Sequence, residues 1–288
     1  MLTHGILSQM QYAVQAAVPA GFNPEAYGDL YYWWDFTDDT TMTFSAGTTI
    51  ATVSNKAART SGNETLNTVV GTPTFTDSTN GSRFDSLDSI CNSPGVNGGN
   101  LDTLMNGVSA TVIWIGEVVG YVAPTNQDGN NLWSAAGNKI DDIRVSAFNK
   151  SSSVTGTRCP TDNIVSPTYQ YELGFHDWTG TSQYSYRTYD QNWTAAGPTM
   201  LSTVIDYGSG VYNGVSLAKN DQLLCTTVPG GTLRDNTGTS KGFMVNARSR
   251  TTAAQLPANQ YVRHILIYNG TLDDSAITGI YNNWQDNL

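Results

Sequence analysis

The chain has 288 residues, a formal net charge of −10 and only 13% charged residues. Its polarity comes instead from Thr, Ser, Asn and 28 glycines, which indicates short strands and many turns rather than helices. The negative charge disfavours binding to nucleic acid or to an anionic membrane surface, the 39% hydrophobic content excludes a disordered chain, and no apolar run approaches the roughly 20 residues of a membrane-spanning helix.

The first 24 residues contain no Asp, Glu, Lys or Arg. Their apolar side chains recur at spacings of three and four, which predicts a short amphipathic helix. The stripe consists of Leu2, Ile6, Leu7, Met10, Val14 and Val18. So short a helix is marginal alone in water, so the stripe must pack on another surface. It either docks on its own domain or forms an assembly arm that contacts another protein or copy, and we favour the arm.

From residue 27 onward the pattern predicts strands. We expect them at residues 30–36, 41–53 with a turn at Gly47, 111–119, 143–148, 170–175, 183–189, 201–206, 211–217 and 262–268. Residues 111–119 and 262–268 are apolar on both faces, which is typical of central strands covered on both sides. Within 211–217, the pair Asn213-Gly214 predicts a hairpin turn.

One helix is expected after the last strand. Asp273 is its predicted N-cap. Its apolar face is formed by Ile277, Ile280, Tyr281 and Trp284, which follow the helical spacing. There is no fixed-period repeat and no linker-like stretch, so residues 25–288 are interpreted as one domain.

The cysteines do not form a disulfide framework. Cys91, Cys159 and Cys225 are odd in number, far apart and outside any CxxC motif. The start of the sequence lacks the basic region of a signal peptide. We therefore expect a protein made in a reducing cytoplasm, not exported by the Sec route, with inert core thiols.

Six segments carry a family resemblance. They are LYYWWDFTDDTTMT (30–43), ATVSNK (51–56), SRFDSLDSI (82–90), TVIWIGEV (111–118), VYNGVSLAKND (211–221) and RHILIYNGTLDDSAITGIYNNW (263–284). In order and spacing they resemble the concanavalin A-like lectin/glucanase superfamily, in the laminin-G-like form found in bacteriophage virion proteins. Ser86 and Ser89 depart from the Gly and Asp of that pattern, and the Glu at the third helical position is missing.

The resemblance implies an all-β fold in which two antiparallel sheets pack as a jelly-roll sandwich. The N-terminal arm lies outside it, and one short C-terminal helix belongs to it. The superfamily contains lectins, glucanases, adhesion modules and structural parts, so the fold does not decide the function.

The sequence argues against catalysis. Retaining glucanases of this superfamily carry paired Glu residues on one strand, whereas Glu25, Glu64, Glu117 and Glu172 are scattered singly. A GxSxG match around Ser240 lacks the strand-to-helix context of a nucleophile elbow. We interpret His264, inside a predicted strand, as a satisfied sheet residue.

Ligand binding is the more open question. Asp128, Asp141 and Asp142 are weak Ca²⁺ candidates, although turns explain them as well; no other cofactor is expected. For sugar binding, Trp133 beside Asn130 and Asn131 is the best candidate for an exposed aromatic platform, with Trp178 as a second. The other aromatic residues between 169 and 193 are expected to fill the core.

These observations predict a non-enzymatic structural protein of a tailed-phage virion. Surface decoration, head fibre and tail appendage all fit a homo-oligomeric jelly roll that binds other virion proteins through residues 1–24. The alternative is a carbohydrate-binding adhesin that recognises host cell-surface glycan. A glycan depolymerase, which needs two converging carboxylates, is the third hypothesis.

Overall fold

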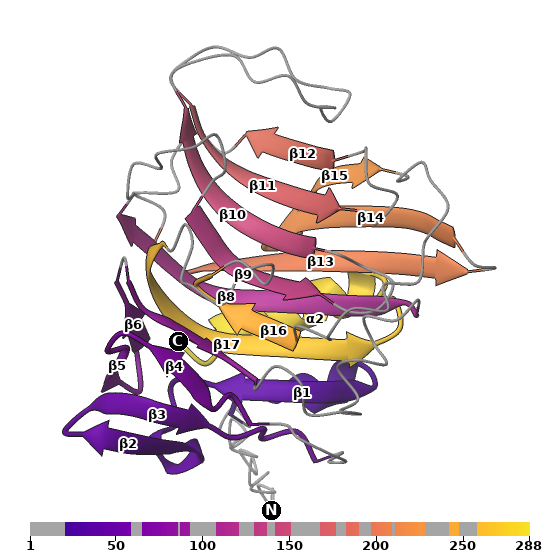
Figure 1. Cartoon of the computed structure of the whole chain (residues 1–288). Helices are drawn as coiled ribbons and strands as arrows, with labels where there is room; N and C mark the ends of the chain where they lie inside the picture. Colours follow the sequence, from indigo (N-terminus) through magenta and orange to yellow (C-terminus); the bar gives the residue numbers. More distant parts are fainter. Residues whose placement is uncertain are drawn as a thin grey trace, which may run out of the picture.

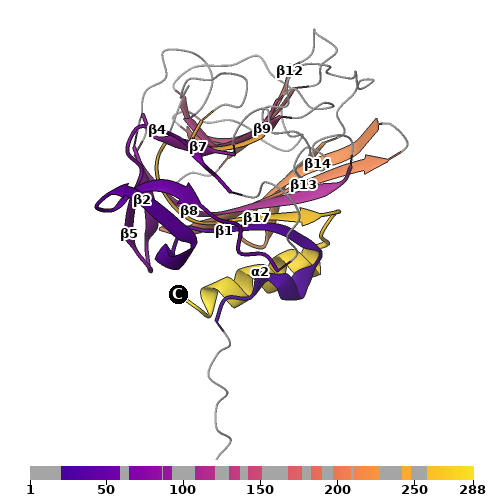
Figure 2. The same ribbon diagram turned by 60° about the horizontal axis from the view of Figure 1, so that its bottom comes forward.

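The computed structural model describes residues 21–58, 65–85, 87–92, 108–120, 130–136, 142–150, 168–176, 183–189, 197–208, 211–227, 242–247 and 258–288. Two antiparallel sheets pack face to face, and one helix covers the outer face of the larger sheet (Figure 1, Figure 2). The predicted all-β sandwich with a C-terminal helix is confirmed. No helix of the described residues is long and apolar enough to cross a membrane.

The larger sheet has ten strands in the described part of the chain. Its spatial order is β15 (Gln222–Thr227), β14 (Val211–Lys219), β13 (Thr199–Gly208), β8 (Ala110–Gly120), β17 (Asn259–Asn269), β6 (Gly81–Phe84), β5 (Thr74–Asp77), β3 (Thr49–Val53) and β2 (Met42–Ala46), while β1 (Leu30–Asp35) also pairs with β17.

The smaller sheet has seven described strands. Their order is β12 (Gln183–Tyr189), β11 (Thr168–His176), β10 (Asp142–Lys150), β9 (Asn130–Ala136), β16 (Gly242–Val245), β7 (Ser89–Cys91) and β4 (Thr68–Val70). Most of the strands expected from the alternating pattern are present, with ends that differ by a few residues.

β17 occupies the middle of the larger sheet. One of its edges pairs with β8 from Asn259 to Asn269. Its other edge is shared, because Gln260–Val262 pair with β6 and the stretch from His264 to Tyr268 pairs with β1. Arg263 therefore lies where three strands meet.

The space between the sheets is filled by apolar side chains. Alternation along β1 turns Trp34 inward, where it is fully buried. Its ring centroid lies 5.3 Å from that of Phe243, which in turn stacks on Trp133 at 5.5 Å. These rings join β1 of one sheet to β16 and β9 of the other, and they form the centre of the core.

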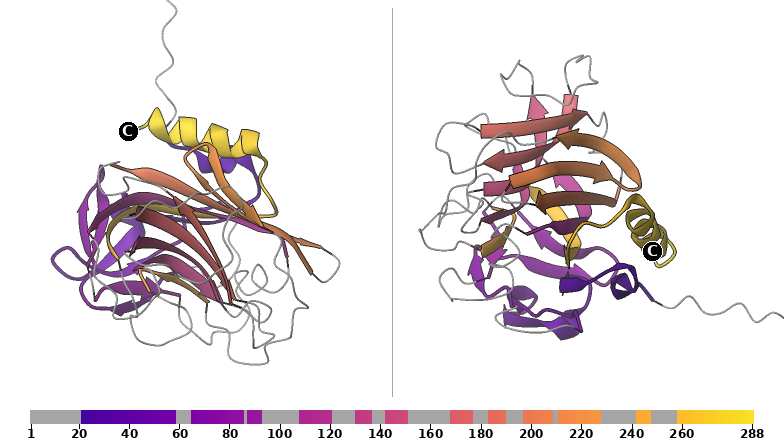
Figure 3. Two further views of the ribbon diagram at one scale, coloured as in Figure 1. Left: turned by 90° about the horizontal axis from the view of Figure 1, so that it is seen from above. Right: turned by 90° about the vertical axis from the view of Figure 1, so that its right-hand side faces the viewer.

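The helix α2 (Asp274–Gln285) packs on the outer face of the larger sheet (Figure 3). The predicted N-cap is confirmed, because the Asp273 carboxylate accepts a hydrogen bond from the Ala276 N–H at 2.8 Å. Its apolar face buries Ile277, Ile280 and Trp284 against side chains of β1, β8 and β17. Two short 3₁₀ helices, η1 (Pro24–Tyr27) and η2 (Asp39–Thr41), flank β1.

Two turn predictions had different outcomes. Gly47 joins β2 to β3 with a φ of 55°, as expected for a glycine in a tight turn. The hairpin predicted at Asn213-Gly214 is wrong, because β14 runs straight through this pair. Asn213 is instead the extra residue of a bulge opposite Asp206 and Tyr207. The turn between β14 and β15 uses Asn220, at a φ of 56°.

Candidate functional site

The predicted sugar platform at Trp133 is wrong. This side chain is 0% exposed, and its ring stacks on Phe243 with 15° between the ring planes. Its neighbour Asn131 is 1% exposed. β9 lies between β10 and β16 within the smaller sheet, so Trp133 points into the sandwich rather than to solvent.

The other predicted site residues stay untested. Trp178, Asp128, Asp141 and the whole arm from Leu2 to Val18 lie outside the described residues. Asn130 and Asp142 belong to strands β9 and β10, but their side chains are outside the described part. Within the described residues, no three His, Cys, Asp or Glu side chains are grouped as a metal site requires.

A cavity of about 600 Å³ opens on the outer face of the larger sheet, beside the end of α2. Aromatic side chains and charged or hydroxyl side chains both line it. The residues that matter for its chemistry are Phe22, Trp33, Asp35, Lys56, Arg263 and His264. We call this hollow the outer cavity.

A β-bulge in β17 builds the floor of the outer cavity. Val262 pairs with Gly116 and His264 with Ile115, so Arg263 is an extra residue without a partner on β8. The flanking Val262 and Ile265 both belong to the core between the sheets. The bulge therefore places two successive side chains, Arg263 and His264, on the outer face.

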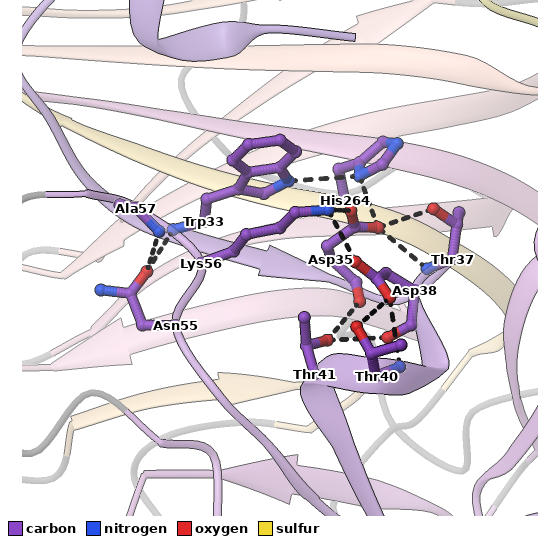
Figure 4. A network of polar contacts seen from close by, with 10 residues as sticks. All are labelled: Trp33, Asp35, Thr37, Asp38, Thr40, Thr41, Asn55, Lys56, Ala57 and His264. Carbon is purple, nitrogen blue, oxygen red and sulfur yellow. Dashed lines mark hydrogen bonds and ion pairs between the residues drawn. The ribbon is translucent and has the colours of Figure 1, made fainter. Parts of the chain in front are cut away.

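Asp35 is the hub of the polar contacts at the cavity wall (Figure 4). Its carboxylate accepts hydrogen bonds from the Thr37 N–H at 3.0 Å and the Thr37 hydroxyl at 2.6 Å. Lys56 Nζ lies 2.8 Å from Asp35 Oδ2 and also 2.8 Å from Asp38 Oδ2. His264 Nδ1 lies 3.2 Å from Asp35 Oδ1.

These contacts keep Asp35 ionised. Burial alone would raise the pKa of its carboxyl group, but hydrogen bonds from His264, Lys56 and Thr37 outweigh burial and hold the pKa well below its usual range. The pKa of the Asp38 carboxyl group is lowered in the same way. Burial would raise it, but hydrogen bonds from Lys56 and Thr40 outweigh this effect.

His264 Nδ1 has two polar neighbours. It accepts a hydrogen bond from Trp33 Nε1 at 3.4 Å, and Asp35 Oδ1 lies 3.2 Å from it. The expectation that His264 is a sheet residue is confirmed, and its side chain is 7% exposed. Its Nε2 has no hydrogen-bond partner among the described residues.

Arg263 differs from its neighbours. It is only 5% exposed, yet its Nε and Nη1 have no hydrogen-bond partner in the described part of the chain. Burial lowers the pKa of its guanidinium, and the more distant charges of Glu117 and Asp77 oppose that shift. An arginine nevertheless stays protonated in a protein, so a positive charge without a close counter-ion among the described residues lies at this wall of the cavity.

Sequence patterns do not single out this group of residues. Asp35, Lys56 and Arg263 stand out in the sequence only as members of the segments that carry the family resemblance. A signal was present, because two adjacent polar residues, Arg263 and His264, interrupt an otherwise apolar strand. Strict alternation would bury one of them, so a bulge is required.

Comparisons with known proteins concern the fold. No protein-family model and no curated protein sequence matches the chain. The structure is similar to that of the Trypanosoma rangeli sialidase, with a TM-score of 0.52 and 12% identity over 90% of this chain and 33% of that one. It is also similar to domain 4 of the arabinanase AbnA from Geobacillus stearothermophilus, with a TM-score of 0.47 and 14% identity over 88% and 99% of the two chains.

A third similar structure is the CBM40 of the Ruminococcus gnavus IT-sialidase, with a TM-score of 0.42 and 13% identity over 66% of this chain and 92% of that one. None of these three is a phage protein. At 12% identity, the similarity to the sialidase structure shows a β-sandwich fold and does not decide the function.

Proposed function

We propose that this protein is a non-catalytic carbohydrate-binding protein and that its saccharide occupies the outer cavity. The observation that carries the proposal is the combination of aromatic and polar side chains in one hollow. Sugar rings have apolar faces and hydroxyl-bearing rims, so their sites pair aromatic surfaces with hydrogen-bonding groups. A volume of about 600 Å³ also lies within the range of ordinary ligand pockets.

The aromatic part of the cavity is a connected wall. The ring centroid of Phe22 lies 6.0 Å from that of Trp33, edge to face, and 4.8 Å from that of His264. Lys56 Nζ lies over the Trp33 ring, 4.7 Å from the ring centroid. A wall held in this way offers a sugar face a surface that needs no rearrangement on binding.

The polar part of the cavity supplies both donors and acceptors. His264 Nε2 and the Arg263 guanidinium have capacity left among the described residues. Ser78 and Thr79 line the rim and are exposed. Hydroxyl groups of a saccharide both donate and accept, and they match such a mixed set.

The carboxylate of Asp35, which lines the cavity, and that of Asp38, which is bound to the same lysine, argue against glycoside hydrolysis. That chemistry needs a general acid whose pKa is raised so that it stays protonated near neutral pH. Asp35 and Asp38 have lowered pKa values, and both are held by Lys56. Neither can serve as that acid, which supports binding without catalysis.

The virion hypothesis stays a prediction, because its arm lies outside the described residues. The structure does indicate where a truncation that tests the arm should end. Phe22 packs on Trp33, and the Pro24 carbonyl accepts a hydrogen bond from the Tyr268 hydroxyl at 2.8 Å. A truncation that probes the arm without disturbing the sandwich should therefore remove residues 1–20 rather than 1–24.

A blocking variant tests the carbohydrate proposal. Ser78 is exposed on the cavity rim, so Ser78→Trp fills the hollow without altering the core. Thr76→Trp is the matched control, since Thr76 is exposed on β5 and does not line the outer cavity. Wild type, Ser78→Trp and Thr76→Trp are applied to an array of neutral and charged glycans, and hits are quantified by calorimetry.

We expect the wild type and Thr76→Trp to bind the same glycans and Ser78→Trp to lose at least tenfold in affinity. Absence of binding to every neutral and charged glycan would refute the carbohydrate function. If Ser78→Trp bound glycans as tightly as the wild type, the saccharide would bind elsewhere and the outer cavity would not be its site.

A further inference from the structure

Arg263 presents a charge that the described structure does not balance. Its side chain is 5% exposed, and neither Nε nor Nη1 has a hydrogen-bond partner. A buried, unpaired charged group is strongly unfavourable, so such groups are normally paired with an opposite charge. Nη2 is not one of these buried atoms without a partner, and the Arg263 side chain lines the outer cavity.

The carboxylates near Arg263 are already engaged or too distant. Asp35 is bound by Thr37, Lys56 and His264, and no ion pair joins it to Arg263 among the described residues. Glu117 and Asp77 influence Arg263 only through space, because neither forms an ion pair with it. In the part of the chain that the structure describes, Lys56 is thus neutralised by Asp35 and Asp38, whereas Arg263 has no close anion.

The bulge shows how this position arises. Without the extra residue in β17, alternation would direct Arg263 and His264 to opposite faces of the sheet. The bulge turns both to the cavity, where His264 is bonded to Asp35 and Arg263 is not. Bulges are used elsewhere to direct a side chain towards a functional site.

A carboxylate is the group that fits this position. The planar guanidinium donates charge-assisted hydrogen bonds to carboxylates with favourable geometry. The net charge of −10 gives the protein no general attraction for acidic polymers. Recognition of an acidic ligand must therefore come from a local cation of this kind.

We infer that the saccharide in the outer cavity is acidic and that a carboxylate of one of its sugar rings pairs with Arg263. This inference rests on the carbohydrate function proposed above and assigns its ligand class. Arg263 selects the carboxylate, while Phe22 and Trp33 contact the apolar face of the ring.

The experiment compares glycans that differ only in charge. Polygalacturonate, alginate and hyaluronan are each presented beside the same polymer after chemical reduction of its carboxyl groups, with polyglutamate as a carboxylate without sugar. Wild type is compared with Arg263→Gln and with Arg83→Gln. Arg83 is a matched control because it lies on the neighbouring strand β6, pairs with Asp85 at 2.6 Å and does not line the cavity.

We expect the wild type to bind at least one carboxylated glycan and to lose about tenfold or more in affinity when its carboxyl groups are reduced, the loss that one charge-assisted hydrogen bond represents. Arg263→Gln should lose the same factor, and Arg83→Gln should keep wild-type affinity. Ser78→Trp should bind none of these glycans.

Each contrary result has a distinct meaning. Binding of neutral glycans only, sensitive to Ser78→Trp, would overturn the acidic class and leave the carbohydrate function intact. Equal affinity of Arg263→Gln for the carboxylated glycan would overturn the role of Arg263. If the wild type bound polyglutamate as tightly as the carboxylated glycans, a sugar would not be required for binding. Absence of binding to every polymer would refute both proposals.

Discussion

The strands β1 and β17 have an apolar inner face and a polar outer face. On the inner side, Trp34 and Ile265 are fully buried in an apolar core. On the outer side, Trp33, Asp35 and His264 belong to a network of hydrogen bonds and ion pairs. One pair of strands thus stabilises the sandwich with one face and forms a polar cavity with the other.

The comparison predicts that the inner side contributes most to stability. Trp34→Ala should lower the free energy of unfolding by about 3–5 kcal/mol, because it removes a ring stacked between Tyr32 and Phe243. Trp33→Ala should cost clearly less, since Trp33 is 8% exposed and borders the cavity. Chemical denaturation measures both variants, and equal losses would remove the distinction between the two sides.

On the outer side the largest effect should come from the hub of the network. Asp35→Asn should lower the free energy of unfolding by about 2 kcal/mol, because it leaves Lys56 and His264 without their carboxylate. This is less than for a fully buried pair, because the Lys56 side chain is 34% exposed and water can solvate it again. Asp39→Asn, at an exposed position in η2, is the matched control and should leave stability unchanged.

The same variant should change the pH dependence of stability. The pKa of Asp35 is lowered in the folded state, so its contribution is complete above the ordinary carboxyl pKa of about 4 and is lost as the pH falls below it. The melting temperature of the wild type should therefore drop more steeply than that of Asp35→Asn between about pH 4 and pH 2. Parallel curves would show that the network adds no pH-dependent stability.

The smallest effect should have the opposite sign. Arg263→Met replaces an unpaired buried charge by an apolar side chain of similar length, and should raise the free energy of unfolding by about 1 kcal/mol. Arg83→Met, which removes an arginine that is paired with Asp85, should not stabilise the protein. A loss of stability in Arg263→Met would mean that the guanidinium is already satisfied, and it would weaken the case for an anionic ligand.

Alternation and helical spacing were sufficient to predict the main strands and the helix, whereas the two-sheet sandwich was implied by the family resemblance. The apolar runs around residues 111–119 and 262–268 are the central strands β8 and β17, and Asp273 caps α2. These features depend on short-range patterns that one sequence displays fully. The hairpin turn predicted at Asn213-Gly214 was wrong because this pair also occurs in bulges. Only the pairing of β14 with β13 decides between the two.

The site was less accessible to sequence reasoning. Trp133 has polar neighbours in the sequence, which suggested exposure, but burial depends on the opposite sheet, where Trp34 contacts the same Phe243. The outer cavity is lined by Asp35 of β1 and by Arg263 and His264 of β17, the strand with which β1 pairs. Such proximity follows from strand order, which the alternating pattern does not encode.

β17 is synthesised long after β1, with which it pairs. Trp33 and His264 are 231 positions apart in the sequence, so at roughly 5–20 residues per second the partner emerges about 10–50 s after β1 has left the ribosome. Until then β1, β6 and β8 all lack the strand that joins them. During this interval the nascent chain therefore has unpaired strand edges, which are the features that promote aggregation of incompletely folded β proteins.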